Sequence, residues 1–267
     1  MGTSGWLYPP WRGVFYPPGL AQRRELEYLS RLVGSVEING SFYSLQRPAS
    51  FQKWFAQTPD DFLFAVKGGR FITHMKRLND VETPLANFFA SGLLALEHKL
   101  GPILWQFPGN FQFDADRLAS FFRLLPRSTK AAAALAEHHD SRLDGRQWTV
   151  AETDRPLRHA IEVRHAGFAD PSFAELLREH DIGLVVADTA GRFPYFEDVT
   201  SDFVYVRLHG DIELYASGYS PSALDRWAEK VRNWHQQRDV YVYFDNDMKV
   251  KAPGDALSLQ SRLPWSS

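Results

Sequence analysis

Short apolar runs alternate with amphipathic windows along most of the chain. The runs are rich in β-branched and aromatic residues, which is typical of buried strands, and helical windows separate them. This alternation predicts a parallel sheet covered by helices. The predicted strands are Thr3–Trp6, Val36–Asn39, Phe62–Lys67, Ile103–Phe107, His159–Val163, Gly183–Asp188, Phe203–His209 and Val240–Asp245.

The windows between these runs repeat apolar residues at i, i+3, i+4 and i+7, the spacing of one helix face. Asp114, Asp170 and Ser220 precede three of the windows and are predicted N-caps. The predicted helices centre on Leu26–Val33, Phe51–Phe55, Leu85–Leu96, Leu118–Leu125, Phe173–Leu177 and Leu224–Val231.

Eight strands in strict alternation with helices favour a single (β/α)8 TIM-like barrel over residues 1–267. The length allows about 33 residues for each βα unit, close to the natural size of such a repeat. An open doubly wound sheet is the alternative. It is less favoured because the first turn has no glycine-rich dinucleotide fingerprint and no Walker-type lysine loop occurs.

Composition and charge narrow the class of protein without naming a reaction. The net charge is −2, so no global field draws the chain to nucleic acid or an anionic membrane. The absence of cysteine excludes disulfides and thiolate chemistry. No signal segment or membrane-length apolar run is visible, so we expect a cytoplasmic protein that does not bind membranes.

Polar residues gather where the predicted strands end. In a barrel these carboxyl ends form one face, which carries the active site. Since each buried charge costs several kcal/mol unless it is paired or solvated, this concentration predicts a polar ligand cleft. The residues are Glu37, Asn39, Lys67, Gln106, Glu162, Arg164, Asp188, Arg207, His209, Asp245 and Asn246.

These residue types suggest acid/base chemistry on an anionic substrate. The candidate catalytic residues are Glu37, Glu162, Asp188 and His209. The candidate substrate-binding residues are Trp6, Asn39, Tyr43, Lys67, His74, Gln106, Arg164, His165, Arg207, Asp245 and Asn246.

Two further chemistries are weighed at the same residues. Glu162, Asp188 and His209 have the ligand types for a divalent metal, but only one of them is a histidine, so a metal is possible but not favoured, and the cofactor is left open. Lys67 would suit Schiff-base chemistry if desolvated. The Gly68-Gly69-Arg70 sequence after it favours an anion-binding turn instead.

Two loops combine aromatic or basic residues with turn formers. The segment 7–20 contains Tyr8, Trp11, Phe15 and Tyr16 among prolines, which suits either stacking on a ligand or capping the barrel. The segment 68–80 is basic and its paired glycines could form a hinge.

Ordered motifs over nearly the whole chain resemble the YecE-like family, also called domain of unknown function 72. The resemblance implies a TIM-like barrel with no established reaction. The family usually has asparagine where this chain has Asp245. The motifs are GTSGW at 2–6, EIN at 37–39, FAVK at 64–67, GPILWQFP at 101–108, EVRH at 162–165, YVRLHG at 205–210 and YFDND at 243–247.

Three functions remain open. The first is a hydrolase or lyase acting on a phosphorylated or sugar-containing small molecule. The others are a nucleotide or nucleic-acid binding protein, with metal-assisted phosphodiester cleavage as one form, and a barrel that binds a metabolite without turnover. A standard retaining glycosidase is disfavoured by analogy, since strands four and seven end in Gln106 and His209. Whether Glu37 and Glu162 can cooperate across the barrel stays open, as does the oligomeric state.

Overall fold

Eight parallel strands close into one barrel in chain order, with β1 paired to β8. The computed structural model describes residues 1–263, and it confirms the predicted (β/α)8 architecture. The strands are β1 (Gly2–Ser4), β2 (Ser35–Ile38), β3 (Leu63–Lys67), β4 (Leu100–Gln106), β5 (His159–Glu162), β6 (Gly183–Asp188), β7 (Phe203–Leu208) and β8 (Asp239–Phe244).

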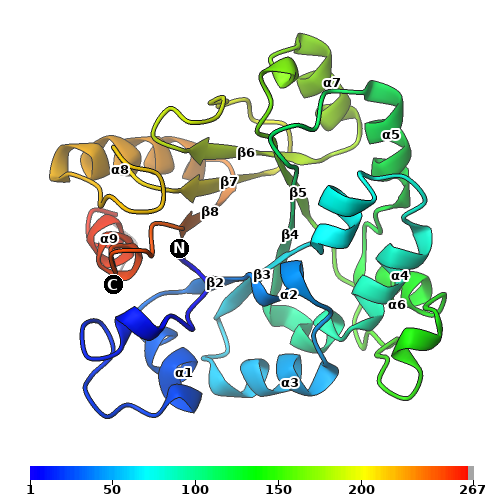
Figure 1. The fold of residues 1–267 in the computed structure, drawn as a ribbon, viewed down its shortest axis with the longest axis horizontal. Coiled ribbons are helices and arrows are strands. Elements are labelled where there is room, and N and C mark those ends of the chain that lie inside the picture. The colour runs from blue at the N-terminus through cyan, green and yellow to red at the C-terminus, as the bar shows by residue number, and fades with distance from the viewer. Residues whose placement is uncertain (264–267) are drawn as a thin grey trace.

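Helices surround the strands, as Figure 1 shows. Within residues 1–263, no helix is long and apolar enough to cross a membrane. The α-helices are α1 (Glu25–Leu29), α2 (Gly40–Tyr43), α3 (Pro48–Gln57), α4 (Glu82–Ala90), α5 (Ala115–Leu124), α6 (Thr129–Ala136), α7 (Pro171–Glu179), α8 (Pro221–His235) and α9 (Ala252–Gln260). Short 3-10 segments are η1 (Pro9–Trp11), η2 (Gln22–Arg24), η4 (Leu93–Lys99), η5 (Ser141–Leu143) and η6 (Ala166–Phe168), and η3 (Phe71–Met75) is a π turn.

The predicted N-caps are confirmed. Asp114 accepts a hydrogen bond from the backbone N–H of Arg117, and Ser220 accepts one from that of Ala223. Asp170 directly precedes Pro171, the first residue of α7, and its side chain accepts a hydrogen bond from the backbone N–H of Ser172. Each side chain satisfies a backbone donor that the first turn of a helix leaves free.

Two apolar layers fill the molecule. The larger lies between the strands and the surrounding helices and includes most of the phenylalanines. The smaller fills the barrel interior, where alternate residues of each strand point inward. Its buried members are Ala65, Leu104, Ala160, Val185, Ala187, Phe203, Tyr205 and Tyr243.

Backbone conformation explains where elements end earlier than predicted. β1 ends at Ser4 because Gly5 has a φ of 87°, which leaves Trp6 beyond the strand. β2 ends at Ile38 because Asn39 turns into the helical region before α2. The window 85–96 is not one helix, since Gly92 has a φ of 114° and separates α4 from η4.

Gly68, directly after β3, lies against the indole of Trp105. A Cβ built at Gly68 would be 2.2 Å from a ring carbon of Trp105. We expect Gly68→Ala to lower the free energy of unfolding by about 1–3 kcal/mol, because overpacking forces the buried ring to move. Urea denaturation measures this change.

Gly34→Ala is the matched control, since a Cβ there meets no atom within 4 Å. A Gly68→Ala protein as stable as Gly34→Ala would show that the Trp105 ring moves at no cost.

Candidate functional site

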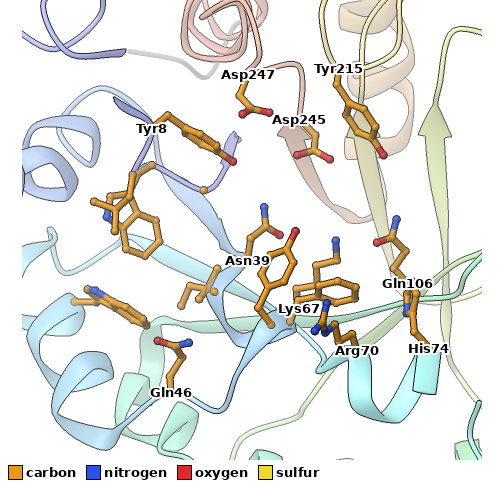
Figure 2. A pocket seen from close by; sticks show the side chains of 18 of the residues that line it. Tyr8, Asn39, Gln46, Lys67, Arg70, His74, Gln106, Tyr215, Asp245 and Asp247 are labelled. Atoms are coloured by element: carbon orange, nitrogen blue, oxygen red, sulfur yellow. The ribbon is translucent and has the colours of Figure 1, made fainter. Parts of the chain in front are cut away.

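A cleft of about 900 Å³ opens at the carboxyl ends of the strands. Figure 2 shows its labelled side chains pointing into a common space from opposite walls. The polar residues that line it are Tyr8, Asn39, Gln46, Lys67, Arg70, His74, Gln106, Arg164, Tyr215, Asp245 and Asp247. The apolar and aromatic ones are Trp6, Leu7, Ile38, Phe42, Tyr43, Trp54 and Met75.

The residues predicted from the sequence divide into three groups. Those that line the cleft are Trp6, Asn39, Tyr43, Lys67, His74, Gln106, Arg164 and Asp245. Those that are fully buried and do not line it are Glu37, Glu162, Arg207 and His209. Those with local partners outside it are Asp188, His165 and Asn246.

Arg207 is the centre of the buried group. It is 0% exposed. Its Nη1 donates to Glu162 Oε2 at 2.7 Å, and its Nε donates to Glu37 Oε2 at 3.0 Å. Its Nη2 donates to Glu37 Oε1 at 2.9 Å, to Asp245 Oδ2 at 2.9 Å and to Ser4 Oγ at 3.0 Å. One guanidinium therefore joins Glu37 and Glu162, although they come from strands far apart around the barrel.

Glu162 also positions two residues of the cleft. Its Oε1 accepts hydrogen bonds from Gln106 Nε2 at 2.8 Å and from Arg164 Nε at 2.9 Å. Burial opposes the charge of Glu162, but Arg207, Arg164 and His209 hold its pKa well below the usual value. Glu162 is thus an ionised partner of cations, and it is not itself open to the cleft.

The pKa of Arg207 shows the reciprocal effect. Burial alone would lower it, yet Glu37, Asp245 and Glu162 raise it well above its usual value. The Tyr205 hydroxyl also donates a hydrogen bond to Glu37 Oε2 at 2.6 Å, so this carboxylate has donors besides Arg207. A guanidinium with so many acceptors holds the strands together and has little capacity left for a ligand.

Strand alternation explains why Asp188 and Asn246 lie outside the cleft. Val185 and Ala187 of β6 point into the barrel, so Asp188 faces the helix layer, where Tyr219 donates to it at 3.1 Å. Asn246 is 0% exposed and donates to Asp255 Oδ2 at 2.8 Å.

His165 has a local structural role. Its Nδ1 accepts from the backbone N–H of Gly167 at 3.0 Å and caps the short segment after β5.

The metal triad considered from the sequence does not form. His209 Nε2 and Glu162 Oε1 are 4.0 Å apart, but Asp188 points away from them. Over residues 1–263, no group of three or more histidine and carboxylate side chains is arranged to hold a metal ion.

The two predicted loops contribute unequally to the cleft. In the segment 7–20, Trp11 and Tyr16 are buried, at 0% and 1% exposure, and pack with Phe15 in the apolar layer outside the strands. Tyr8 alone of these four aromatic residues lines the cleft. In the segment 68–80, Arg70 and His74 line the cleft, and the π turn η3 orders the chain between them.

The cleft has a cationic side and an acidic side. Lys67 and Arg70 lie opposite Asp245 and Asp247 in Figure 2. Burial and then the nearby Arg207 lower the pKa of Lys67 to about 8. Burial and then the charges of Lys67 and Arg164 lower the pKa of His74 to about 4, so its ring is neutral at pH 7.

The two carboxylates of the acidic side have separated pKa values. Asp245 is ionised, because Arg207 and His209 lower its pKa against the effect of burial. Its Oδ2 lies 3.0 Å from His209 Nδ1, without the alignment of a hydrogen bond. Burial and then the charge of Asp245 raise the pKa of Asp247 to about 6. Two carboxyl groups whose environments separate their pKa values commonly serve as acid and base.

Several cleft residues were missing from the sequence-based set. Asp247 belongs to the YFDND motif, and its two-residue spacing from Asp245 is the signal in the sequence. Tyr8 and Arg70 belong to the aromatic segment 7–20 and the basic segment 68–80, and Tyr215 comes from the loop after β7. Loop residues lack a strand period, so nothing in the sequence fixed their direction.

The fold and the cleft define a (β/α)8 barrel with a charged site at the carboxyl ends of its strands. The chain belongs to the DUF72 family, described as a protein of unknown function, whose sequence profile matches residues 1–267. The resemblance found in the motifs is therefore confirmed.

Relatives found by sequence agree with this family, and their names state no reaction. The UPF0759 protein YecE of Escherichia coli strain K12 is 26% identical over 274 aligned positions, which cover 95% of this chain and 88% of that protein. The UPF0759 protein YunF of Bacillus subtilis strain 168 is 30% identical over 124 residues, 45% of this chain and 43% of that one.

Solved structures agree. A DUF72 family protein from Thermotoga maritima MSB8 has a TM-score of 0.76 and 28% identity, covering 97% of this chain and 96% of that one. A DUF72 family protein from Enterococcus faecalis V583 has a TM-score of 0.69 at 19% identity, covering 89% and 87%, and supports the fold alone.

Proposed function

We propose that the protein is a hydrolase or lyase that acts on a phosphorylated or sugar-containing small molecule in the strand-end cleft. One observation carries this proposal. The cleft sets cationic side chains opposite Asp247, a carboxyl group whose raised pKa of about 6 lets it both give and take a proton near neutral pH. A volume of about 900 Å³ suits a small ligand.

The cationic side would bind the anionic or electron-rich end of the substrate. Arg164 uses Nε for Glu162, and its Nη2 donates to the Tyr215 hydroxyl at 3.0 Å, which fixes the guanidinium and leaves further N–H groups toward the cleft. Arg70 lies at the exposed rim, 5.8 Å from the ring centre of Tyr43. Lys67 adds a third positive centre deeper in the cleft.

The aromatic wall would hold the remainder of the substrate. Trp6 and Trp54 meet edge to face with ring centres 5.3 Å apart, and both line the cleft. Phe42 and Tyr43 do the same at 5.1 Å. Flat apolar faces next to hydrogen-bonding groups are suited to sugar rings, which have apolar faces and polar edges.

A ligand screen by thermal stabilisation tests this proposal. We expect phosphorylated sugars to raise the melting temperature, and Arg164→Gln to weaken their binding by about tenfold, because a hydrogen bond to a charged group is lost. Arg226→Gln is the matched control, since Arg226 is exposed on α8 and does not line the cleft.

Two results would count against the proposal. The first is a screen in which no phosphorylated or sugar-containing compound stabilises the folded protein.

The second comes from a separate titration of labelled single-stranded DNA at several salt concentrations, which tests the nucleic-acid alternative. Tight, strongly salt-dependent binding that Arg164→Gln weakens would favour that alternative.

A further inference from the structure

Lys67 is a largely buried side chain whose amine opens to the cleft and is not used by the fold. It ends β3, shares the inward face with Ala65 and is 8% exposed. Within residues 1–263 its Nζ has no hydrogen bond and no ion pair, and its close partner is the ring of Phe42, with Nζ 4.5 Å from the ring centre.

The other deeply buried lysine shows what a structural ammonium looks like in this fold. Lys99 is 3% exposed, and its Nζ donates to Phe55 O at 2.8 Å, to Thr58 O at 2.8 Å and to Thr58 Oγ1 at 3.3 Å. Lys99 does not line the strand-end cleft, whereas Lys67 does. Lys67 Nζ is not one of the fully buried atoms that lack a partner, so the amine opens to the cleft and is held there without a structural hydrogen bond. This setting favours a role for the amine toward a bound ligand.

The surroundings of Lys67 suit a neutral, nucleophilic amine. Burial is the largest influence, and the pKa of about 8 leaves a reactive unprotonated fraction at mildly alkaline pH. In that unprotonated fraction the Nζ lone pair is free to form a bond to carbon. Figure 2 shows the Lys67 side chain reaching into the cleft toward the side that Asp245 and Asp247 occupy.

We propose that Lys67 forms a Schiff base with the carbonyl carbon of an aldehyde or ketone bound in the cleft. This inference rests on the proposed function and narrows its substrate class to carbonyl compounds. The Nζ lone pair forms a C–N bond, and the carbonyl π electrons move to oxygen, which takes a proton. After Nζ loses a proton, an acid protonates the carbinol oxygen, water leaves, and an iminium ion remains.

We assign the exchange of these protons to Asp247. It lines the same cleft as Lys67, and its pKa is raised to about 6. For a substrate with a β-hydroxyl, removal of that hydroxyl proton breaks the Cα–Cβ bond, and the electron pair moves into the iminium. An aldehyde leaves, the enamine carbon takes a proton, and water hydrolyses the second imine. This sequence is a lyase reaction, and it needs no oxidant or metal.

Reductive trapping tests the inference on the wild-type chain. The protein is incubated at pH 8 with glycolaldehyde phosphate or glycolaldehyde, reduced with borohydride and mapped by peptide mass spectrometry. We expect Lys67 to be labelled at least about tenfold faster than Lys53, an exposed lysine outside the cleft, because the lowered pKa of Lys67 leaves a large share of its amine neutral at pH 8. Labelling of Lys67 should rise with a midpoint near pH 8.

Lys67→Arg removes the nucleophilic amine and keeps a positive charge at the same position. Arginine cannot form an imine, so this variant should still bind phosphorylated ligands and yet lose turnover of the substrate; its melting temperature shows whether it folds. Slower labelling at Lys67 than at Lys53, or unchanged turnover by Lys67→Arg, would overturn the Schiff base while leaving the proposed function in place. Failure of every ligand to bind, with Lys67 still trapped, would instead overturn the proposed function.

Discussion

Replacing Arg207 with methionine is expected to lower the free energy of unfolding by about 3–5 kcal/mol, because removal of one partner leaves buried charges without compensation. Glu37 and Glu162 are both 0% exposed and both bond to this guanidinium. Methionine fills much of the volume of arginine, so the loss of stability comes more from the missing charge than from a cavity. Urea denaturation at pH 7 measures it.

A second measurement identifies the cause. The pKa of Glu162 is held low in the folded protein, so its contribution to stability is present above the unfolded value of about 4 and is lost as the pH falls below it. Arg207→Met should therefore flatten the acid side of the stability profile.

Arg226→Met on the exposed face of α8 is the control and should change stability by less than about 0.5 kcal/mol. Equal stabilities of the two variants at pH 7 would show that the barrel does not depend on its central ion network.

Asp247→Asn should reduce turnover of the substrate selected by the screen by about 10²–10⁴-fold, the usual contribution of a general acid or base. Asparagine keeps the size of the side chain and cannot exchange a proton. Because the pKa of Asp247 is raised to about 6, the wild-type rate should change through that pH, and the variant should lose this limb of the profile.

Asp116→Asn serves as the control, since Asp116 lies exposed near the start of α5 and outside the cleft. A pH profile for Asp247→Asn that keeps its limb near pH 6 would assign that titration to another group.

The architecture was predictable because a strand buried on both faces leaves a continuous apolar run in the sequence. The inward direction of Glu37, Lys67, Gln106 and Arg207 follows from the two-residue alternation of side chains along each strand. That alternation also placed Asp188 with Leu184 and Val186, which now lie in the helix-facing layer, so its exclusion from the cleft was available from the sequence.

Depth along the barrel axis could not be predicted. Glu37 and Asn39 share a face, yet Glu37 is 0% exposed beneath the floor while Asn39 lines the cleft. The difference depends on how neighbouring strands are staggered, and stagger is set by the closed sheet. The pairing of Glu37 with Glu162 through Arg207 was hidden for the same reason.

The network around Arg207 also bears on how the chain is made. Its partner Ser4 lies 203 residues earlier in the sequence, and Glu37 lies 170 residues earlier. During synthesis the chain grows from its N-terminus, so both must stay hydrated until most of the polypeptide has left the ribosome. The first strands therefore have no finished interior of their own, and a nascent chain that stops before β7 would leave Glu37 and Glu162 without the guanidinium that neutralises them in the closed barrel.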